Sequence, residues 1–200
     1  MSPAPSRRVV AVAAVAALVA LPAAAGAAKG PGSPAAQRAK GPTQAQLAAA
    51  ISTVTYERVY GSQYRIQKAR FPRAAYPSGP GIIWDNNGCS VPKQLVDLEL
   101  GGGRIPRGKP VAYYAGLFEK SCDRHDFGYR NYGTNSGGRA LDATEARRLS
   151  IDARFLANMD HQCRTVFSRK YVEAIQRGAC YKAADVFKLA VTKRGQPNFY

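Results

Sequence analysis

One stretch decides the fold: Ser121-Cys122-Asp123-Arg124-His125-Asp126-Phe127-Gly128-Tyr129-Arg130-Asn131-Tyr132. At the i, i+3, i+4 spacing of a helix, His125 shares one face with apolar residues, namely Phe118, Cys122, Tyr129 and Tyr132. The chain of 200 residues contains only two histidines. An imidazole on such a face is often a hydrogen-bonded core residue without chemistry. Its role therefore depends on what the rest of the chain places beside it.

A second stretch, from Arg148 to Met159, carries another titratable group on an apolar face. Helical spacing aligns Asp152 with apolar residues and a cysteine, namely Leu149, Phe155, Leu156, Met159 and Cys163. A carboxylate is almost never fully buried without a partner. We therefore predict that the two helices face each other and bring Asp152 against His125. A carboxylate in that position orients the imidazole of a general base and stabilises its charged form.

The remaining pattern predicts one all-α domain over residues 43–200. Strand signals are nearly absent. We expect a small, disulfide-stapled helical domain in which two long antiparallel helices carry the active site. The further expectations are a helix from a Thr43-x-x-Gln46 capping box to about Val59, a loop over 71–81, an irregular insertion over 91–115, a helix over 143–163, two helices over 169–176 and 180–191 broken at Gly178, and a frayed tail over 192–200.

The first 27 residues have the pattern of a secretory signal peptide. Arg7 and Arg8 precede an apolar run over 9–21, and small residues follow at a cleavage site near Ala23 to Ala27. The apolar run is shorter than the roughly 20 residues that a membrane-spanning helix needs. We expect residues 28–42, which are rich in Gly, Pro, Ala and Lys, to form a flexible leader. The protein is thus predicted to be secreted and extracellular.

Export favours disulfides, and four cysteines allow three pairings. We favour Cys89–Cys122 with Cys163–Cys180, because the second bridge closes a short helix-turn-helix. Zinc is the alternative, since Cys122, His125, His161 and Cys163 supply four possible ligands. Their spacing fits no standard zinc finger, and an oxidising compartment disfavours free thiolates.

The formal net charge is +16, and the first acidic residue is Glu57. Such a charge favours anionic partners, which include a membrane surface, lipid headgroups, nucleic acid and cell-wall polymers. It does not choose among them. A secreted nucleic-acid-binding protein remains an alternative that rests on charge alone.

The segment from Ile82 to Ser90 joins the only tryptophan, Trp84, to an Asn-Gly turn. The side-chain and backbone oxygens of such a turn suit a hard cation such as calcium. An ordinary turn is the other interpretation, because no EF-hand spacing is present. The apolar residues Ile82, Ile83 and Trp84 fit either a membrane-inserting edge or the core.

The run Cys122-x-x-His125-Asp126, followed by Phe-Gly-Tyr-Arg-Asn-Tyr, resembles the secreted phospholipase A2 superfamily, in particular its bacterial and fungal branch. Ile151-Asp152, placed 11 residues before Cys163, is similar to the second active-site helix of that family. The loop that ends in Gly88-Cys89-Ser90 resembles its calcium loop. The resemblance covers about residues 84–191.

This resemblance implies a secreted, calcium-dependent phospholipase A2. His125 would activate a water for attack on the sn-2 ester of a glycerophospholipid, and Asp152 would hold the imidazole tautomer. Ca²⁺ would be bound by the side chains of Asp126 and Asn87 and by the carbonyl of Gly88. The expected partner is a phospholipid membrane or micelle surface, anionic in view of the charge. We expect no nucleic-acid partner and a monomeric protein.

The chain departs from the family pattern at Asn87, where the family usually has aspartate. One negative charge fewer predicts weak calcium binding. Asp85 would replace it if the loop were shifted in register. The alternative function is a catalytically impaired phospholipase A2-like protein that binds anionic membranes. No family role falls on His161.

Overall fold

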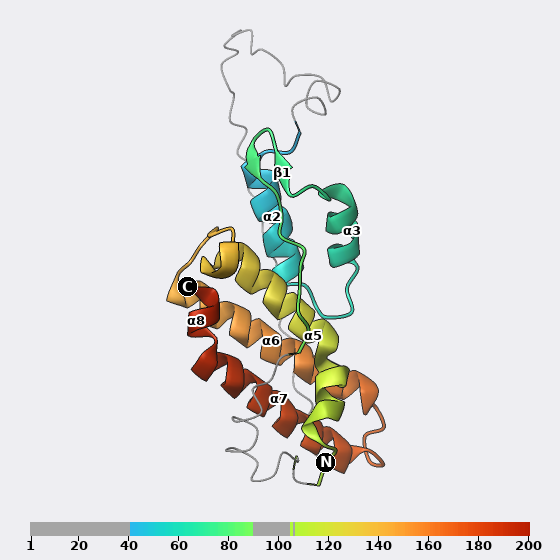
Figure 1. Cartoon of the computed structure of the whole chain (residues 1–200). Helices are drawn as coiled ribbons and strands as arrows, with labels where there is room; N and C mark the ends of the chain where they lie inside the picture. Colours follow the sequence, from blue (N-terminus) through green and yellow to red (C-terminus); the bar gives the residue numbers. More distant parts are fainter. Residues whose placement is uncertain (1–40, 90–104, 106) are drawn as a thin grey trace, which may run out of the picture. The chain divides into compact units, whose positions relative to one another are not determined.

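A computed structural model describes residues 41–89, 105 and 107–200. The predicted signal peptide, residues 28–40 of the leader, and residues 91–104 and 106 of the expected insertion lie outside this part. Its elements are α2 (Gln44–Thr55), α3 (Gln63–Arg70), β1 (Ala75–Tyr76), β2 (Gly79–Pro80), α5 (Val111–Tyr132), the 3-10 turn η1 (Asn135–Gly137), α6 (Glu145–Val166), α7 (Ala174–Arg194) and α8 (Gln196–Phe199) (Figure 1). The all-α prediction is confirmed, since β1 and β2 form only a two-residue antiparallel hairpin. Among the described helices, none is both long and apolar enough to span a bilayer.

The predicted pair of long helices is α5 and α6, which run antiparallel. Ser121, in the middle of α5, contacts Gln162 near the end of α6, whereas His125 contacts Asp152 near its beginning. Helix α7 packs against both (Figure 1). Helix α5 begins at Val111, immediately after Pro110, whereas the sequence predicted irregular structure as far as Ala115. A proline is tolerated there because the first N–H groups of a helix have no intrahelical partner.

Two clusters of buried apolar side chains meet at His125. The first joins α2, the C-terminal half of α5, the start of α6 and α8, and the second joins the N-terminal half of α5 with α6 and α7. The imidazole centroid lies 4.1 Å from that of Tyr129 in the first cluster and 4.8 Å from that of Phe155 in the second. His125 is therefore held between two packed layers rather than on a free surface.

The Trp84 side chain belongs to the first of these clusters. It is buried, its indole N–H donates to the carbonyl of Phe71, and its ring packs on Tyr64 and Phe127. The core interpretation is thus confirmed, and the membrane-inserting interpretation of Trp84 is wrong.

Helix α7 corrects the prediction of two helices broken at Gly178. It is continuous from Ala174 to Arg194, and residues 167–173 form a turn instead of a helix. A glycine inside a helix costs only about 1 kcal/mol relative to alanine. Burial of the next residues outweighs that amount, since α7 buries Ala179, Cys180, Ala183, Ala184, Phe187 and Ala190.

The C-terminal tail is ordered, whereas a frayed tail was predicted. Phe199 in α8 is fully buried, and its ring lies 5.1 Å from that of Tyr129. The Thr134 N–H donates to the carbonyl of Phe199 at 2.7 Å. One buried aromatic residue in a polar tail leaves no periodic pattern, so sequence analysis had too little signal to predict this helix.

The N-terminal segments match the predictions in part. The capping box of Thr43 and Gln46 is present, but α2 ends at Thr55 rather than near Val59. Helix α3 was not predicted. It buries none of its residues, so it has no apolar face for a pattern search to find.

Gly128 lies on α5 close to side chains of both α6 and α2. A Cβ atom there would lie 3.0 Å from methyl groups of both Ile151 and Thr55. We expect Gly128→Ala to destabilise the protein by about 1–3 kcal/mol through overpacking. The control is Gly116→Ala in the same helix, where the added methyl group meets nothing within 4 Å and should stabilise by about 0.5–1 kcal/mol. Urea denaturation measures both, and equal shifts in the same direction would contradict the close approach.

Candidate active site

His125 and Asp152 form a buried hydrogen-bonded pair between α5 and α6. Their Nε2 and Oδ1 atoms are 2.9 Å apart, and the residues are 7% and 1% exposed. The structure therefore brings together the two residues that the helical spacing predicted to meet. Because a carboxylate only accepts hydrogen bonds, the neutral imidazole carries its proton on Nε2 and leaves the Nδ1 lone pair free.

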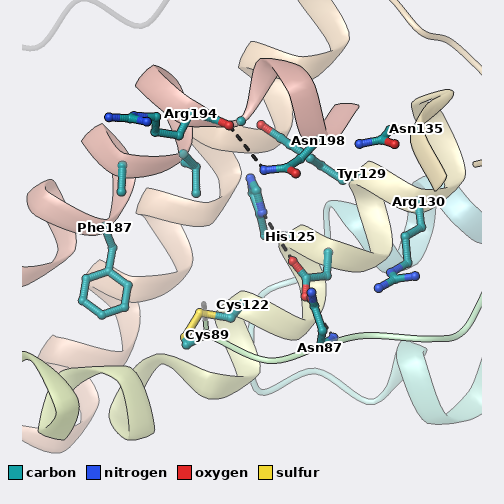
Figure 2. Close-up of a pocket in the computed structure, with 14 residues that line it drawn as sticks. Asn87, Cys89, Cys122, His125, Tyr129, Arg130, Asn135, Phe187, Arg194 and Asn198 are labelled. Atoms are coloured by element: carbon teal, nitrogen blue, oxygen red, sulfur yellow. Dashed lines mark hydrogen bonds and ion pairs between the residues drawn. A yellow bond between two sulfur atoms is a disulfide. The ribbon is translucent and has the colours of Figure 1, made fainter. Parts of the chain in front are cut away.

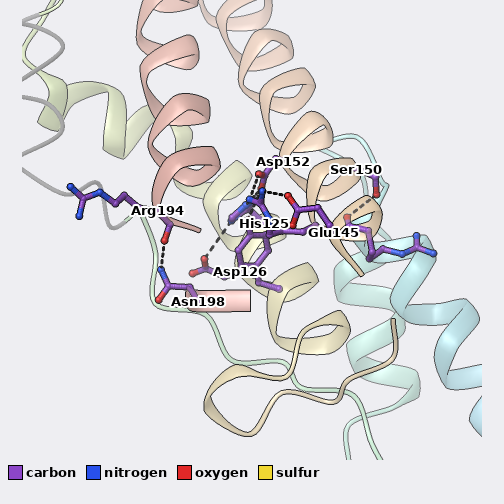
Figure 3. A network of polar contacts seen from close by, with 10 residues as sticks. His125, Asp126, Glu145, Ser150, Asp152, Arg194 and Asn198 are labelled. Atoms are coloured by element: carbon purple, nitrogen blue, oxygen red, sulfur yellow. Dashed lines mark hydrogen bonds and ion pairs between the residues drawn. The ribbon is translucent and has the colours of Figure 1, made fainter. Parts of the chain in front are cut away.

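Asp152 has two further partners, which pattern analysis did not assign (Figure 3). The Tyr129 hydroxyl donates to Oδ1 at 2.7 Å, and Arg148 Nη1 donates to Oδ2 at 3.1 Å. Burial, followed by the Asp152 charge, raises the pKa of Tyr129, so this hydroxyl keeps its proton and acts as a donor. Both carboxylate oxygens are thus satisfied, as a buried charge requires.

Arg148 is itself buried and links the pair to solvent. Its Nε and Nη2 atoms donate to Glu145 at 2.8 and 2.6 Å, and Glu145 is exposed. Hydrogen bonding to Glu145 is the main reason that the pKa of Arg148 is raised, so the guanidinium stays charged. Arg148 takes the inward position, whereas Leu149, which we predicted on the inner face, is 44% exposed. The i, i+4 spacing of Arg148 and Asp152 is the sequence signal that could have identified this pair.

Asp126 lies on the other side of the imidazole. Its Oδ1 is 3.9 Å from His125 Nδ1, which is too long for a hydrogen bond but close enough for a charge to act. Its Oδ2 accepts the backbone N–H of Asn87 at 3.2 Å. The predicted metal-binding helix residue and loop are therefore in contact.

The loop that carries Asn87 is fixed to α5 by a disulfide. Cys89 pairs with Cys122, and Cys163 pairs with Cys180, which is the pairing that the sequence favoured. No free cysteine remains, so the zinc site with thiolate ligands is wrong. Gly88 has a φ of +71°, a conformation that favours glycine. The turn before Cys89 therefore depends on a glycine at position 88.

A cavity of about 290 Å³ opens beside the imidazole (Figure 2). Its wall on α7 is apolar, with Phe187, Ala190 and Val191. His125 and Asp126 also line the cavity. The polar remainder of its lining includes Asn87, Tyr129, Arg130, Asn135, Arg194 and Asn198. Figure 2 shows Asn87 and the Cys89–Cys122 disulfide on one side of His125, with Tyr129 and Asn198 on the other.

The oxygen atoms at this cavity are of the kinds that bind a hard cation, but together they carry little negative charge. Asp126 offers a carboxylate and Asn87 an amide, and Gly88 follows Asn87 in the same turn. These are oxygen types that calcium takes. In the described part of the chain, no group of three or more His, Cys, Asp or Glu side chains could hold a metal ion. Asp85 is exposed and is not among the residues that line the cavity, so Asn87 is the loop residue in place.

A family model described as prokaryotic phospholipase A2 matches residues 61–195. The chain belongs to the prokaryotic phospholipase A2 family. A phospholipase A2 is a carboxylic ester hydrolase, and the matched residues include the His125–Asp152 pair, the Asn87 loop and both disulfides. The family match also begins before Trp84 and covers α3 and the hairpin. No curated protein and no solved structure matched the chain.

The two histidines of this phospholipase A2 should titrate on opposite sides of 6.5. Burial lowers the pKa of His125, but the carboxylates of Asp126 and Asp152 raise it by more, so the net direction is upward. Desolvation and the charges of Arg58, Arg164 and Arg154 lower the pKa of His161. NMR titration of the imidazole protons in EDTA should therefore give one midpoint above and one below 6.5. The spectrum of His161→Asn assigns them, and a His125 midpoint below 6.5 would contradict this electrostatic account.

Proposed function

We propose that this member of the family is a secreted, calcium-dependent phospholipase A2 that hydrolyses the sn-2 ester of glycerophospholipids. One observation carries the proposal. His125 has one ring nitrogen bound to the buried Asp152 and the other on the side of Asp126, which lines the cavity. A base held in one tautomer at the wall of a cavity is the arrangement that proton abstraction from a water requires.

In this mechanism the Nδ1 atom of His125 takes a proton from the water that attacks the ester carbonyl. The ring becomes an imidazolium, and Asp152 stabilises its charge through the Nε2–H bond. Tyr129 and Arg148 hold the carboxylate in place. His125 then gives its proton to the departing glycerol oxygen, which restores the neutral ring.

Calcium, held by Asp126 with Asn87 and the Gly88 carbonyl, would supply Lewis-acid stabilisation of the charge that develops on the ester oxygen. The support for this assignment is the contact of the loop with Asp126 and the oxygen chemistry of both. With one carboxylate, affinity should fall in the weak range of about 10⁻⁴–10⁻³ M typical of extracellular modules.

The substrate surface is proposed from charge and lining. The apolar wall of α7 suits an acyl chain, while Arg130 and Arg194 add positive charge to the lining. The formal charge of +16 favours an anionic membrane or micelle surface. Export is supported by the signal-peptide pattern over 1–27 and by two disulfides, which persist in oxidising compartments.

The test is hydrolysis of a phosphatidylcholine labelled separately at each acyl position, with calcium titrated from zero. We expect label release from the sn-2 position alone, saturation with calcium, and loss of release in EDTA. Release from sn-1, or an unchanged rate in EDTA, would overturn the proposal.

A catalytically impaired membrane-binding relative is the second candidate, and Asn87 is the observation that favours it. In this case the single carboxylate of Asp126 would give the site too little negative charge to hold calcium, because Asn87 supplies no second carboxylate. Liposome binding in EDTA with no hydrolysis at any calcium concentration would support this reading over the enzyme.

Asn87→Asp should tighten calcium binding by about tenfold, because affinity follows the charge of the ligand set. Isothermal titration measures the change. Asp85→Asn is the matched control, since that side chain is exposed and outside the cavity lining, and it should leave affinity unchanged. Weaker binding in Asp85→Asn would mean that the loop binds calcium in the shifted register.

A further inference from the structure

The turn between α6 and α7, residues 167–173, can be followed in Figure 1. This turn and the start of α7 carry exposed apolar side chains that have no role in the site. Tyr171 and Val172 in the turn are 86% and 75% exposed, and Ile175 in the first turn of α7 is 63% exposed. These are the three most exposed of the large hydrophobic residues in the described part of the chain. We name them the α6–α7 apolar tip. Three such residues together are more than the scattered apolar exposure of an ordinary surface.

The tip is held rigidly. The Arg177 guanidinium donates to the carbonyls of Phe167 at 2.7 Å and Lys170 at 3.0 Å, and so ties the first half of the turn to α7. The Glu173 carboxylate accepts the backbone N–H of Arg169 at 3.0 Å. The Cys163–Cys180 disulfide joins the two helices just beyond. The exposed side chains are therefore displayed by a braced turn, so their exposure is a built feature of this surface.

The sequence around the tip is rich in cations. Between residues 164 and 182 the chain has five basic residues and a single acidic one, Glu173, which is engaged within the turn. The basic residues are Arg164, Arg169, Lys170, Arg177 and Lys182. The Lys170 ammonium lies 5.7 Å from the centroid of the Tyr171 ring. Exposed apolar side chains in a segment with an excess of basic residues match the apolar interior and negative headgroups of an anionic bilayer.

We propose that the α6–α7 apolar tip inserts into the headgroup region of anionic phospholipid bilayers and anchors the protein there. The charge argues against a second copy as the occupant, because two such tips would repel each other. The shape argues against a protein partner, since a stable protein interface buries roughly 800 Å² on each side, more than three protruding side chains supply. A bilayer needs no matching pocket, and a tyrosine suits its interface because one end is apolar and the other polar.

The anchor is separate from the catalytic cavity. Ile175 precedes Phe187, the first α7 residue of the cavity lining, by twelve positions, or about 18 Å of helix at 1.5 Å per residue. Binding at the tip would thus leave the cavity free. The role of the anchor rests on the proposed function, because it would hold a phospholipase on its substrate surface, but bilayer binding itself does not require hydrolysis.

The first experiment measures sedimentation with phosphatidylglycerol vesicles in EDTA, using the secreted full chain. We expect the triple variant Tyr171→Ser, Val172→Ser, Ile175→Ser to bind at least about tenfold more weakly. The matched control is Ile66→Ser, Tyr113→Ser, Leu149→Ser, which removes three apolar residues that are 44–45% exposed elsewhere and should bind as the parent does. Thermal unfolding followed by circular dichroism checks that both variants fold. Equal loss in both, or no loss in the first, would overturn the proposal.

The second experiment detects insertion directly. With Tyr171→Trp, the added indole emission should shift to shorter wavelength on phosphatidylglycerol vesicles and far less on phosphatidylcholine vesicles. Tyr113→Trp is the control and should not shift. An unshifted Tyr171→Trp spectrum would contradict insertion. Sedimentation velocity of the triple variant distinguishes self-association, since a change in oligomeric state in place of vesicle binding would assign the tip to a second copy.

The third experiment separates this inference from the proposed function. The triple variant should hydrolyse a short-chain monomeric phospholipid at the parent rate, and hydrolyse vesicles with a higher apparent KM. If no form of the protein hydrolyses lipid but the tip still controls vesicle binding, the anchor stands and the enzyme proposal fails. If monomeric and vesicle hydrolysis are both unaffected by the triple variant, the anchor fails and the enzyme proposal stands.

Discussion

Replacing His125 with asparagine is expected to lower the rate of sn-2 ester hydrolysis by about 10²–10⁴-fold, the contribution typical of a positioned general base. An asparagine amide has no nitrogen that can accept a proton near neutral pH. The water would then attack without a base beside it, whatever the cavity still binds. The substrate is expected to bind nearly as well, so the loss should fall on kcat.

The fold of this variant should survive, which makes the result interpretable. Asp152 keeps its hydrogen bonds from Tyr129 and Arg148 when the imidazole is removed. Stability and calcium affinity should therefore change little, and urea denaturation and isothermal titration check both.

The control is His161→Asn. That imidazole is only partly buried and is not part of the cavity lining. Its ring centroid lies 5.7 Å from that of Tyr60. Removing it tests whether any histidine loss lowers the rate. Fatty-acid release at pH 8, measured by titration of the acid formed, should be unchanged in this variant. More than a tenth of the parent rate in His125→Asn would exclude His125 as the base.

The meeting of His125 and Asp152 could be predicted because both lie on helices long enough to show a 3.6-residue period. Each helix of 22 residues presents several apolar residues that fix its inner face, and the misplaced titratable group on each face then identifies its counterpart. The same periodicity placed Leu149 on the inner face, which is wrong. Burial of an apolar side chain stabilises the fold, but pairing the buried Asp152 with a cation stabilises it more. Arg148 therefore faces inward instead of Leu149.

The elements that the sequence missed are those that depend on distant contacts. Whether Gly178 ends a helix is decided by the packing of α7 on α5 and α6, because the local penalty is small. The tail is ordered by the burial of Phe199 beside Tyr129. No pattern in the sequence near residue 199 predicts this contact with Tyr129. The lining of the cavity combines residues from the Asn87 loop, α5, α7 and α8, so only the folded chain brings them together.

Arg148→Met is expected to destabilise the protein by about 3–5 kcal/mol, the usual result of removing one partner from a buried ion pair. Methionine fills much of the space of the aliphatic stem, so the loss is chiefly electrostatic. Asp152 would keep its contacts with His125 and Tyr129 but lose its ion pair with Arg148, whose positive charge does not depend on pH. Urea denaturation at pH 7 measures the change in the free energy of unfolding.

The matched control is Glu145→Gln, which removes the other carboxylate that binds Arg148. Glu145 is exposed, so solvent screens its ion pair, and the Arg148–Asp152 bond remains. We expect little change in stability. A loss in this variant as large as that in Arg148→Met would mean that Arg148 acts through the helix surface rather than through Asp152.

A second measurement separates a structural role of Arg148 from control of the base. With the guanidinium gone, the negative charge of Asp152 acts on the imidazole without compensation, so the pKa of His125 should rise further above 6.5 than it does in the parent protein. The pKa of His161 should not move. Because the neutral ring is the active form, hydrolysis should then fall at a higher pH as the solution is acidified. An unchanged His125 titration in EDTA, together with unchanged stability, would show that the arginine does not tune this pair.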